Sequence, residues 1–151
     1  TDALDRPALL DAMRRRHTFA TNGIRPWLEV SLDGVAMGGE LEASSDAPMH
    51  RLHVRYEATA PIARLDLVRS GHVLRLDPAE LGLDAPDALA LDLAREIPGL
   101  GPGEFHYVRI LQTDGGIAWS SPIFARAPQA PIQRLRNTKK AAPSGQSAAR
   151  R

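Results

Sequence analysis

Apolar residues alternate with polar residues through most of this chain, and this period of two constrains its fold more than any other feature. Successive side chains of a β-strand point to opposite faces, so such alternation predicts strands with one buried side. The alternating runs are residues 28–32, 35–42, 52–57, 63–67, 72–76, 89–93, 105–113 and 117–124. Seven or eight strands at roughly ten-residue spacing predict an antiparallel β-sandwich of immunoglobulin-like size. Residues 105–113 are apolar on both faces, which is typical of a central strand.

Turn residues separate these runs. Asp33-Gly34 and Asp114-Gly115-Gly116 predict hairpins. Gly38-Gly39 predicts a bulge or a close approach of two backbone segments. The segment from Asp77 to Pro86 is rich in Pro and Asp, and we expect it to cross between the sheets with one helical turn at Pro78–Leu81.

The first residues follow a different period. Residues 5–16 are predicted to form a helix, because Asp5 can cap its N-terminus and Pro7 suits its first turn. Leu9, Leu10 and Met13 then form a narrow apolar stripe on that helix. In a longer protein this stripe is expected to pack against neighbouring elements. Without them it must fold onto the sandwich or pair with another copy of the chain.

The end of this helix is basic. Arg14, Arg15 and Arg16 lie in the last turn, where positive charge complements the helix dipole. We favour this interpretation, together with solubility, over phosphate binding. Residues 17–21 have strand composition, and Asn22-Gly23 ends that strand with turn chemistry.

Charge is distributed unevenly along the 151 residues, although the formal net charge is only +1. All 18 acidic residues precede residue 126, so the body is mildly acidic and the C-terminal tail is basic. The tail is also rich in Pro, Ala, Ser and Gln and has little to bury. We therefore predict a helix and strand at 1–23, a β-sandwich at 24–126 and a disordered basic tail at 127–151.

The basic tail raises the question of a nucleic-acid or anionic-membrane partner. The tail contains no aromatic residue for base stacking and no repeated motif. A solvated terminus is therefore the favoured interpretation, and attachment to nucleic acid or membrane is disfavoured.

Little in the chain points to catalysis. There is no cysteine, which excludes disulfides, thiol nucleophiles and thiolate metal sites but does not distinguish the cytoplasm from a bacterial periplasm. His50 and His53 lie on an alternating run and so point to opposite faces, with His53 toward solvent. No HExxH, GxSxG, P-loop or dinucleotide-binding glycine pattern occurs. Trp27 and Trp119 can make a sugar-binding platform, but we favour buried core positions for both.

Two segments carry a family resemblance. The first is residues 12–23, AMRRRHTFATNG, which precede a strand, Asp33-Gly34 and the turn Met37-Gly38-Gly39. The second, more specific one is residues 107–124, YVRILQTDGGIAWSSPIF. Together they resemble the C-terminal end of PHP-superfamily metallohydrolases of the CehA/McbA type. The resemblance spans about residues 5–125 and leaves the tail uncovered.

The resemblance implies that residues 1–23 end an upstream catalytic barrel and that the following β-rich region completes it. It also implies that the whole protein performs metal-dependent hydrolysis. The divalent metal and its ligands would lie upstream, so no catalytic residue, metal ligand or cofactor is assigned to this chain. If residues 18–21 are a late barrel strand, Thr21, Asn22 and Arg25 would border the substrate pocket.

We therefore expect a non-catalytic accessory module that packs against the upstream barrel of the same protein. As an isolated chain it is expected to self-associate weakly through its N-terminal helix. The alternative is a free-standing β-sandwich binding module for carbohydrate or protein, which would use Trp27, Trp119 and strand-edge loops.

Overall fold

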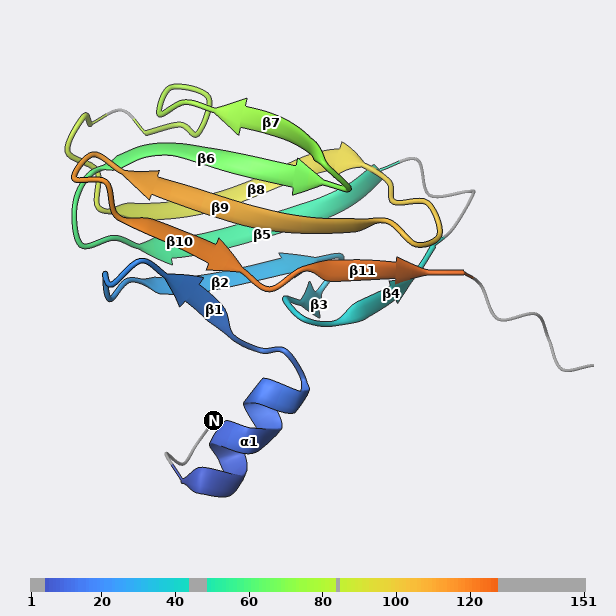
Figure 1. Ribbon diagram of the computed structural model, residues 1–151. Coiled ribbons are helices and arrows are strands. Elements are labelled where there is room, and N and C mark those ends of the chain that lie inside the picture. The colour runs from blue at the N-terminus through green and yellow to red at the C-terminus, as the bar shows by residue number, and fades with distance from the viewer. Residues whose placement is uncertain (1–4, 44–48, 84, 128–151) are drawn as a thin grey trace, which may run out of the picture.

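The computed structural model describes residues 5–43, 49–83 and 85–127. They form one helix and eleven strands (Figure 1). In chain order these are α1 (Arg6–Arg14), β1 (Phe19–Thr21), β2 (Trp27–Leu32), β3 (Val35–Ala36), β4 (Glu40–Glu42), β5 (Met49–Glu57), β6 (Ile62–Arg69), β7 (His72–Leu76), β8 (Ala90–Pro98), β9 (Phe105–Gln112), β10 (Ile117–Ser120) and β11 (Ile123–Arg126). The predicted disorder of the tail concerns residues that, apart from Ala127, lie outside the described ranges.

The strands form two sheets that enclose one hydrophobic core (Figure 1). In the seven-stranded sheet β6 pairs with β7 and β9, and β9 also pairs with β10 and β11. β10 in turn pairs with β1, and β11 pairs with β4. The four-stranded sheet has the order β3-β2-β5-β8. Both sheets contribute fully buried side chains, among them Leu32, Val54, Leu65, Val108 and Ile110. The predicted β-rich fold with one N-terminal helix is confirmed, and neither sheet closes into a barrel.

The alternating runs locate most strands correctly. In β5 every second side chain is buried and the others are half-buried or exposed, as a period of two requires. β9 is the central strand that residues 105–113 predict, since it pairs with three other strands. Residues 35–42 and 117–124 are each divided into two short strands, at Gly38-Gly39 and at Ser121-Pro122.

One strand pair contradicts the prediction that the sheets are antiparallel throughout. β4 runs parallel to β11, with Leu41 opposite Ala125. The chain leaves the four-stranded sheet at Gly38-Gly39 and enters the other sheet as β4, where the last strand is its neighbour. The connection between these two strands is most of the described chain, and a connection that long can join parallel strands. The seven-stranded sheet is therefore mixed.

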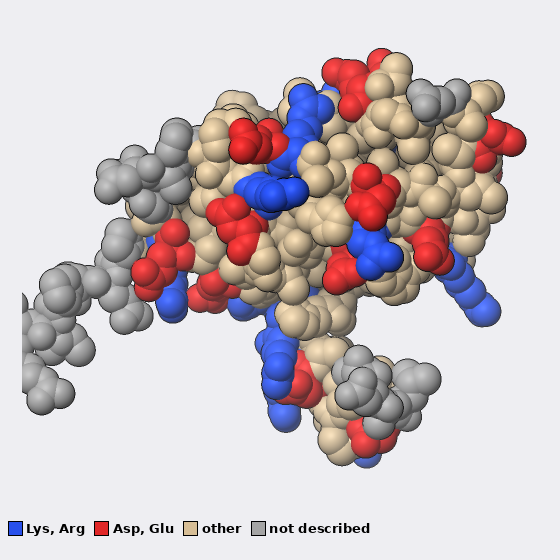
Figure 2. All heavy atoms as spheres, turned by 180° about the vertical axis from the view of Figure 1, so that it is seen from behind, with Lys and Arg blue, Asp and Glu red and all other residues tan. Residues whose placement is uncertain are grey.

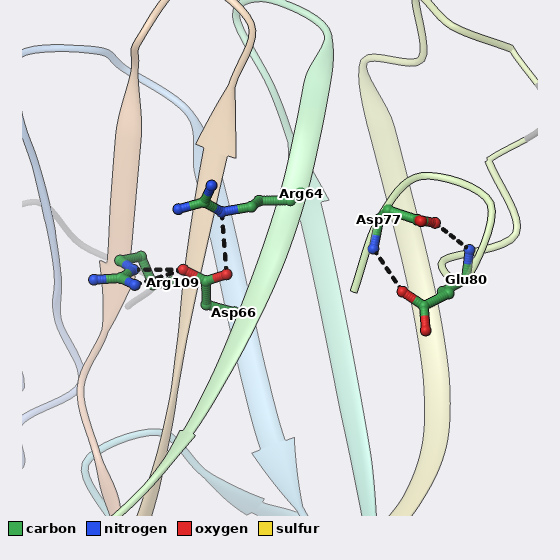
Figure 3. Close-up of polar contacts among 5 residues, drawn as sticks. All are labelled: Arg64, Asp66, Asp77, Glu80 and Arg109. Atoms are coloured by element: carbon green, nitrogen blue, oxygen red, sulfur yellow. Dashed lines mark hydrogen bonds and ion pairs between the residues drawn. The ribbon is translucent and has the colours of Figure 1, made fainter. Parts of the chain in front are cut away.

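Turn chemistry agrees with the sequence. Asp33 and Gly34 both adopt positive φ, at 50° and 80°, as a tight hairpin turn demands. The expected helical turn after Asp77 is present as hydrogen-bonded turns. There, Asp77 N–H donates to the Glu80 carboxylate and Glu80 N–H donates to the Asp77 carboxylate, each at 3.0 Å (Figure 3). This reciprocal pairing orders the segment that carries the chain from β7 to β8.

Candidate docking site

Helix α1 buries none of its residues against the sheets. Its N-terminus is capped as predicted, because the Asp5 carboxylate accepts the N–H of Ala8 at 2.8 Å. The side chains of Leu9, Leu10 and Met13 are 52, 41 and 66% exposed. In Figure 1 the helix lies beyond the edge of both sheets. The apolar stripe therefore does not pack onto the sandwich. Such packing was one of the two arrangements expected for the isolated chain.

The helix ends in a tight turn around Arg16. The N–H of His17 donates to the carbonyl of Ala12 at 2.9 Å, and the N–H of Arg16 donates to that of Met13 at 3.1 Å. These two bonds form a Schellman motif, whose αL position is usually glycine. Here that position is Arg16, with φ of 59°. A non-glycine residue in this region carries about 1 kcal/mol or more of backbone strain. Contacts of the Arg16 side chain are therefore needed to offset this strain.

The Arg16 side chain anchors the helix to the seven-stranded sheet. Its Nε donates to the carbonyl of Gly38 at 2.8 Å, and its Nη2 donates to the Glu40 carboxylate at 3.0 Å. The guanidinium also lies 5.4 Å from the centroid of the Phe124 ring, within cation–π range. The basic residues therefore differ in role: Arg15 pairs with Asp11 on the same helix, whereas Arg16 holds the helix in place.

Strand β1 extends this attachment along β10. Phe19, Ala20 and Thr21 lie opposite Ser120, Trp119 and Ala118 in antiparallel register. The carbonyl of Thr18 accepts from the hydroxyl of Ser121 at 2.8 Å. We call residues 6–21 the arm. The two sequence segments that carry the family resemblance thus lie side by side, and their contacts fix the arm on the sheet.

The three predicted pocket-border residues lie together where the arm ends. Thr21 is half-buried, and its hydroxyl donates to the carbonyl of Ile24 at 2.8 Å. Asn22 spans to the opposite hairpin, where its amide donates to Gly115 O at 3.0 Å and its carbonyl oxygen accepts from Ile117 N–H at 2.8 Å. Arg25 is exposed. Thr21 and Asn22 therefore stabilise the turn, and a role at a substrate pocket stays a prediction.

The histidines do not assemble a metal centre in the described part of the chain, where no group of three or more His, Asp or Glu side chains is placed to hold an ion. His53 lies on the outer face of its sheet, 2.7 Å from Asp92, and His50 points into the core, 2.6 Å from Asp33, as the alternation predicts. His106 is also buried. Burial lowers the pKa of His106, because the charged imidazolium loses its hydration there.

Trp27 is a second candidate site, on the outer face of the four-stranded sheet. The prediction that Trp27 is buried is wrong, since it is 43% exposed. Alternate residues of β2 point to opposite faces, so Trp27 points outward while the next residue, Leu28, points into the core. The Arg55 guanidinium covers its ring at 5.3 Å. A shallow pocket of about 350 Å³ adjoins the pair, with Glu57 and Asp92 in its wall. Trp119 is half-buried on the other sheet.

Comparison with known proteins finds relatives in Chlamydia. A Chlamydia pneumoniae protein is 31% identical over 127 residues, which are 79% of this chain and 20% of that protein. Proteins of Chlamydia muridarum and Chlamydia trachomatis are 31 and 30% identical over the same lengths. All three are described as uncharacterised. The chain thus spans about a fifth of the length of the curated relatives it matches. No family model and no solved structure matches it.

Proposed function

We propose that this chain is a non-catalytic accessory module that docks, through its arm, on a neighbouring domain of the same polypeptide. The observation that carries this proposal is the combination of a firmly anchored helix and an uncovered apolar stripe. Arg16 and β1 fix the position of α1, while Leu9, Leu10 and Met13 remain in solvent. A helix that is fixed in position, but whose apolar side chains pack on no part of its own module, is suited to pack against a neighbouring domain.

Helix energetics support a partner for α1. An isolated helix of nine residues is marginal in water, because nucleation is costly and few hydrogen bonds repay it. Most helices in proteins are stabilised by packing an apolar face. Fully burying a Leu or Met side chain contributes about 1.5–3 kcal/mol, so three such residues supply a substantial docking energy. The relatives' greater length provides chain for a neighbouring domain to occupy this face.

We further propose that the neighbouring domain is a PHP-type hydrolase barrel of the CehA/McbA kind. Support comes from the resemblance of residues 12–23 and 107–124, which the fold brings into contact along β1 and β10. The described residues offer no cluster for a divalent metal. We therefore place the metal, its ligands and the hydrolytic chemistry in the neighbouring domain, with this chain supplying position and cover.

The immunoglobulin-like assignment is part of the same proposal. In that fold strands A, B and E share one sheet and C, F and G share the other. β2, β5 and β8 correspond to A, B and E, while β6, β9 and the divided β10–β11 correspond to C, F and G. The crossing from β5 to β6, from β7 to β8 and from β8 to β9 between sheets supports this correspondence.

The test compares the 151-residue chain with the longer polypeptide encoded by its reading frame, by hydroxyl-radical footprinting. We expect Met13 to be oxidised readily in the isolated chain and to be protected in the longer polypeptide. The double variant Leu9→Gln, Met13→Gln should increase proteolysis between the domains and leave the isolated chain as stable as before, because neither side chain is buried there. Arg14→Gln, on an exposed residue of the same helix, is the matched control.

Equal oxidation of Met13 in both proteins would overturn docking through the arm. A second copy of this chain is the competing occupant of the stripe. Sedimentation of the isolated chain over a range of concentrations separates the two: weak dimers that the double variant abolishes favour self-association. Protection of Met13 only in the longer polypeptide favours the neighbouring domain.

A second function, as a free-standing binding module, is favoured by exposed Trp27. A sugar that displaces the Arg55 guanidinium would stack on the Trp27 ring, and the neighbouring carboxylates of Glu57 and Asp92 would accept hydrogen bonds from its hydroxyls. Quenching of tryptophan fluorescence by a sugar series, compared with Trp27→Ala, tests this. Saturable quenching that disappears in the variant would support the module. Its absence would leave the Trp27–Arg55 pair as a surface contact.

A further inference from the structure

We infer that the outer face of the seven-stranded sheet is a second docking surface, and that its partner is an acidic face of the same neighbouring domain. This inference rests on the proposed function, since it assumes that a neighbouring domain is present. The surface is formed by the outward side chains of β6, β7, β9 and β10, chiefly Arg64, Arg75, Phe105, Tyr107, Arg109 and Trp119. We call it the arginine-aromatic face.

The two outer faces of the molecule differ in charge. On the four-stranded sheet, acidic and basic side chains are interspersed (Figure 2). They also pair there, because Arg55 lies 3.8 Å from Glu29 and 3.9 Å from Asp92. On the arginine-aromatic face the charged side chains are three arginines and one aspartate, Asp66. The first face thus carries charges of both signs that pair with each other, whereas the outward side chains of β6, β7, β9 and β10 include three arginines against one aspartate. The outward Glu40 and Glu42 lie on β4, further along the same sheet, and pair with Arg16 and Arg126.

Asp66 organises these arginines. Its carboxylate is fully buried although it lies on an outward position of β6 (Figure 3). Nε and Nη2 of Arg109 donate to one carboxylate oxygen at 2.9 and 2.5 Å, and Nε of Arg64 lies 3.2 Å from the other. Arg75 is the cross-strand neighbour of Asp66 on β7 and is exposed. Two guanidinium groups therefore lie against one buried carboxylate, and a third arginine is its neighbour on the next strand.

This arrangement leaves donors for another anion. Each guanidinium has five N–H groups, and Asp66 engages only some of them. The buried carboxylate restricts the arginine side chains, so less side-chain freedom is lost when a partner carboxylate binds. Arginine forks bind carboxylates in matched geometry. The remaining N–H groups of Arg64 and Arg109, with Arg75 beside them, are suited to Asp or Glu side chains.

The aromatic residues favour a protein partner over a free anion. Trp119 on β10 lies opposite Arg109 on β9. Two residues further along the same strands, Ile117 lies opposite Leu111 on the same face. Arginine, tryptophan and tyrosine are enriched at the energetic centres of protein interfaces. Apolar contacts around a charged centre would exclude water from it and so strengthen its ion pairs.

The face is also continuous with the arm. Arg16 lies over the ring of Phe124, whose centroid is 6.1 Å from that of Phe105. The ring of Phe105 stacks at 6.4 Å with that of Tyr107, next to the arginines. A domain seated on the stripe of α1 can therefore extend along these rings to Arg109. The arm and the arginine-aromatic face make one surface for one occupant.

The test is footprinting of the isolated chain and the longer polypeptide, with two tryptophans that report on opposite sheets. We expect oxidation of Trp119 and Tyr107 to fall to about a third in the longer polypeptide, because an interface core excludes water. Trp27 on the other sheet should not change. If Met13 is protected but Trp119 is not, the proposed function stands and this inference is overturned. If neither is protected, both fail.

The acidic character of the partner is tested separately. Arg75→Glu reverses an exposed charge without unpairing Asp66, so the variant should fold. In the longer polypeptide we expect it to restore Trp119 oxidation to the rate of the isolated chain. The matched control Arg51→Glu, exposed on the four-stranded sheet, should leave Trp119 protected. Unchanged protection in Arg75→Glu would overturn an acidic partner. Protection of Trp119 in the isolated chain by inorganic phosphate would instead identify a small-anion site.

Discussion

Arg16 and Gly38 are in contact through both backbone and side chain, although they lie far apart in the sequence. A Cβ atom on Gly38 would lie 2.3 Å from the carbonyl oxygen of Arg16, and the Gly38 carbonyl accepts from Arg16 Nε at 2.8 Å. The contact joins the end of α1 to the point where the chain changes sheets. It therefore decides where the apolar stripe of the helix is presented.

Replacing Gly38 with alanine tests how much this contact contributes. Gly38 has φ of 87° and no room for a Cβ, whereas Gly34 has φ of 80° and open space around it. Both substitutions carry backbone strain of about 1–3 kcal/mol, but only Gly38→Ala also displaces the Arg16 backbone. We expect Gly38→Ala to lower the free energy of unfolding in urea by clearly more than Gly34→Ala does. Equal losses would show that Arg16 does not confine Gly38.

The strain at Arg16 predicts an unusual order of variants. Arg16→Ala keeps the αL penalty and loses the contacts with Gly38 and Glu40. Arg16→Gly loses the same contacts but removes the penalty. We therefore expect the glycine variant to be more stable than the alanine variant by about 1 kcal/mol. Urea denaturation of the three proteins measures this, and an alanine variant as stable as the glycine variant would contradict the assigned strain.

Burial of His106 predicts a loss of stability in mild acid. Burial, aided by the charges of Arg69 and His50, lowers its pKa in the folded state below the ordinary value of 6.5. Below that value the unfolded chain binds a proton that the folded chain does not, so stability falls as the pH falls. We expect the free energy of unfolding to decrease between about pH 7.5 and about pH 5.5, by at most about 1.4 kcal/mol per pH unit for this group.

The control for this pH dependence is His106→Gln, which keeps a side-chain donor near Val68 O. Its stability should change less over the same interval, although its value at neutral pH is lower. The interval stays above the range where Glu104 titrates, since hydrogen bonding to Arg69 lowers the pKa of that carboxyl from 4.5. A variant with the same pH slope as the natural protein would assign the effect to another group.

A hydrogen bond between the two sheets predicts how much stability is lost when one buried hydroxyl is removed. Gln112 on β9 donates its Nε2 proton to the Tyr56 hydroxyl of β5 at 2.7 Å, in the buried core. Tyr56→Phe leaves that donor unpaired and should destabilise the protein by about 1–3 kcal/mol in urea denaturation. Tyr107→Phe removes a hydroxyl from the half-buried outer face and should cost much less. A similar cost for both would mean that the link is not stabilising.

Much of the fold was predictable because its causes are local. The alternation in residues 52–57 depends on neighbours two positions apart, and β5 follows it closely. Asp5 caps α1 and Asp33-Gly34 closes a hairpin for reasons contained in a few adjacent residues. The exposure of Trp27 followed from the same alternation, since it precedes inward Leu28. The general preference of tryptophan for the core was the weaker argument there.

The candidate sites were less predictable. The arginine triplet suggested complement to the helix dipole, yet Arg16 is the anchor because Gly38 and Glu40 come within reach of its side chain. Asp66 appeared only as one polar member of an alternating run. Its partner Arg109 lies 43 residues further along the chain, and no local pattern indicates that pairing.

Secondary structure and turns in this protein are specified by contacts between residues close in the sequence. Such local contacts do not specify which strands pair, and so they do not predict the parallel pairing of β4 with β11. They also do not predict the burial of Asp66 or the uncovered face of α1. These features depend on which distant segments share the core, and burial and ion pairing acquire their energies only once those segments meet. Only the tertiary structure therefore shows that Arg16, at the end of the helix, lies over Phe124 and next to the aromatic rings of the seven-stranded sheet.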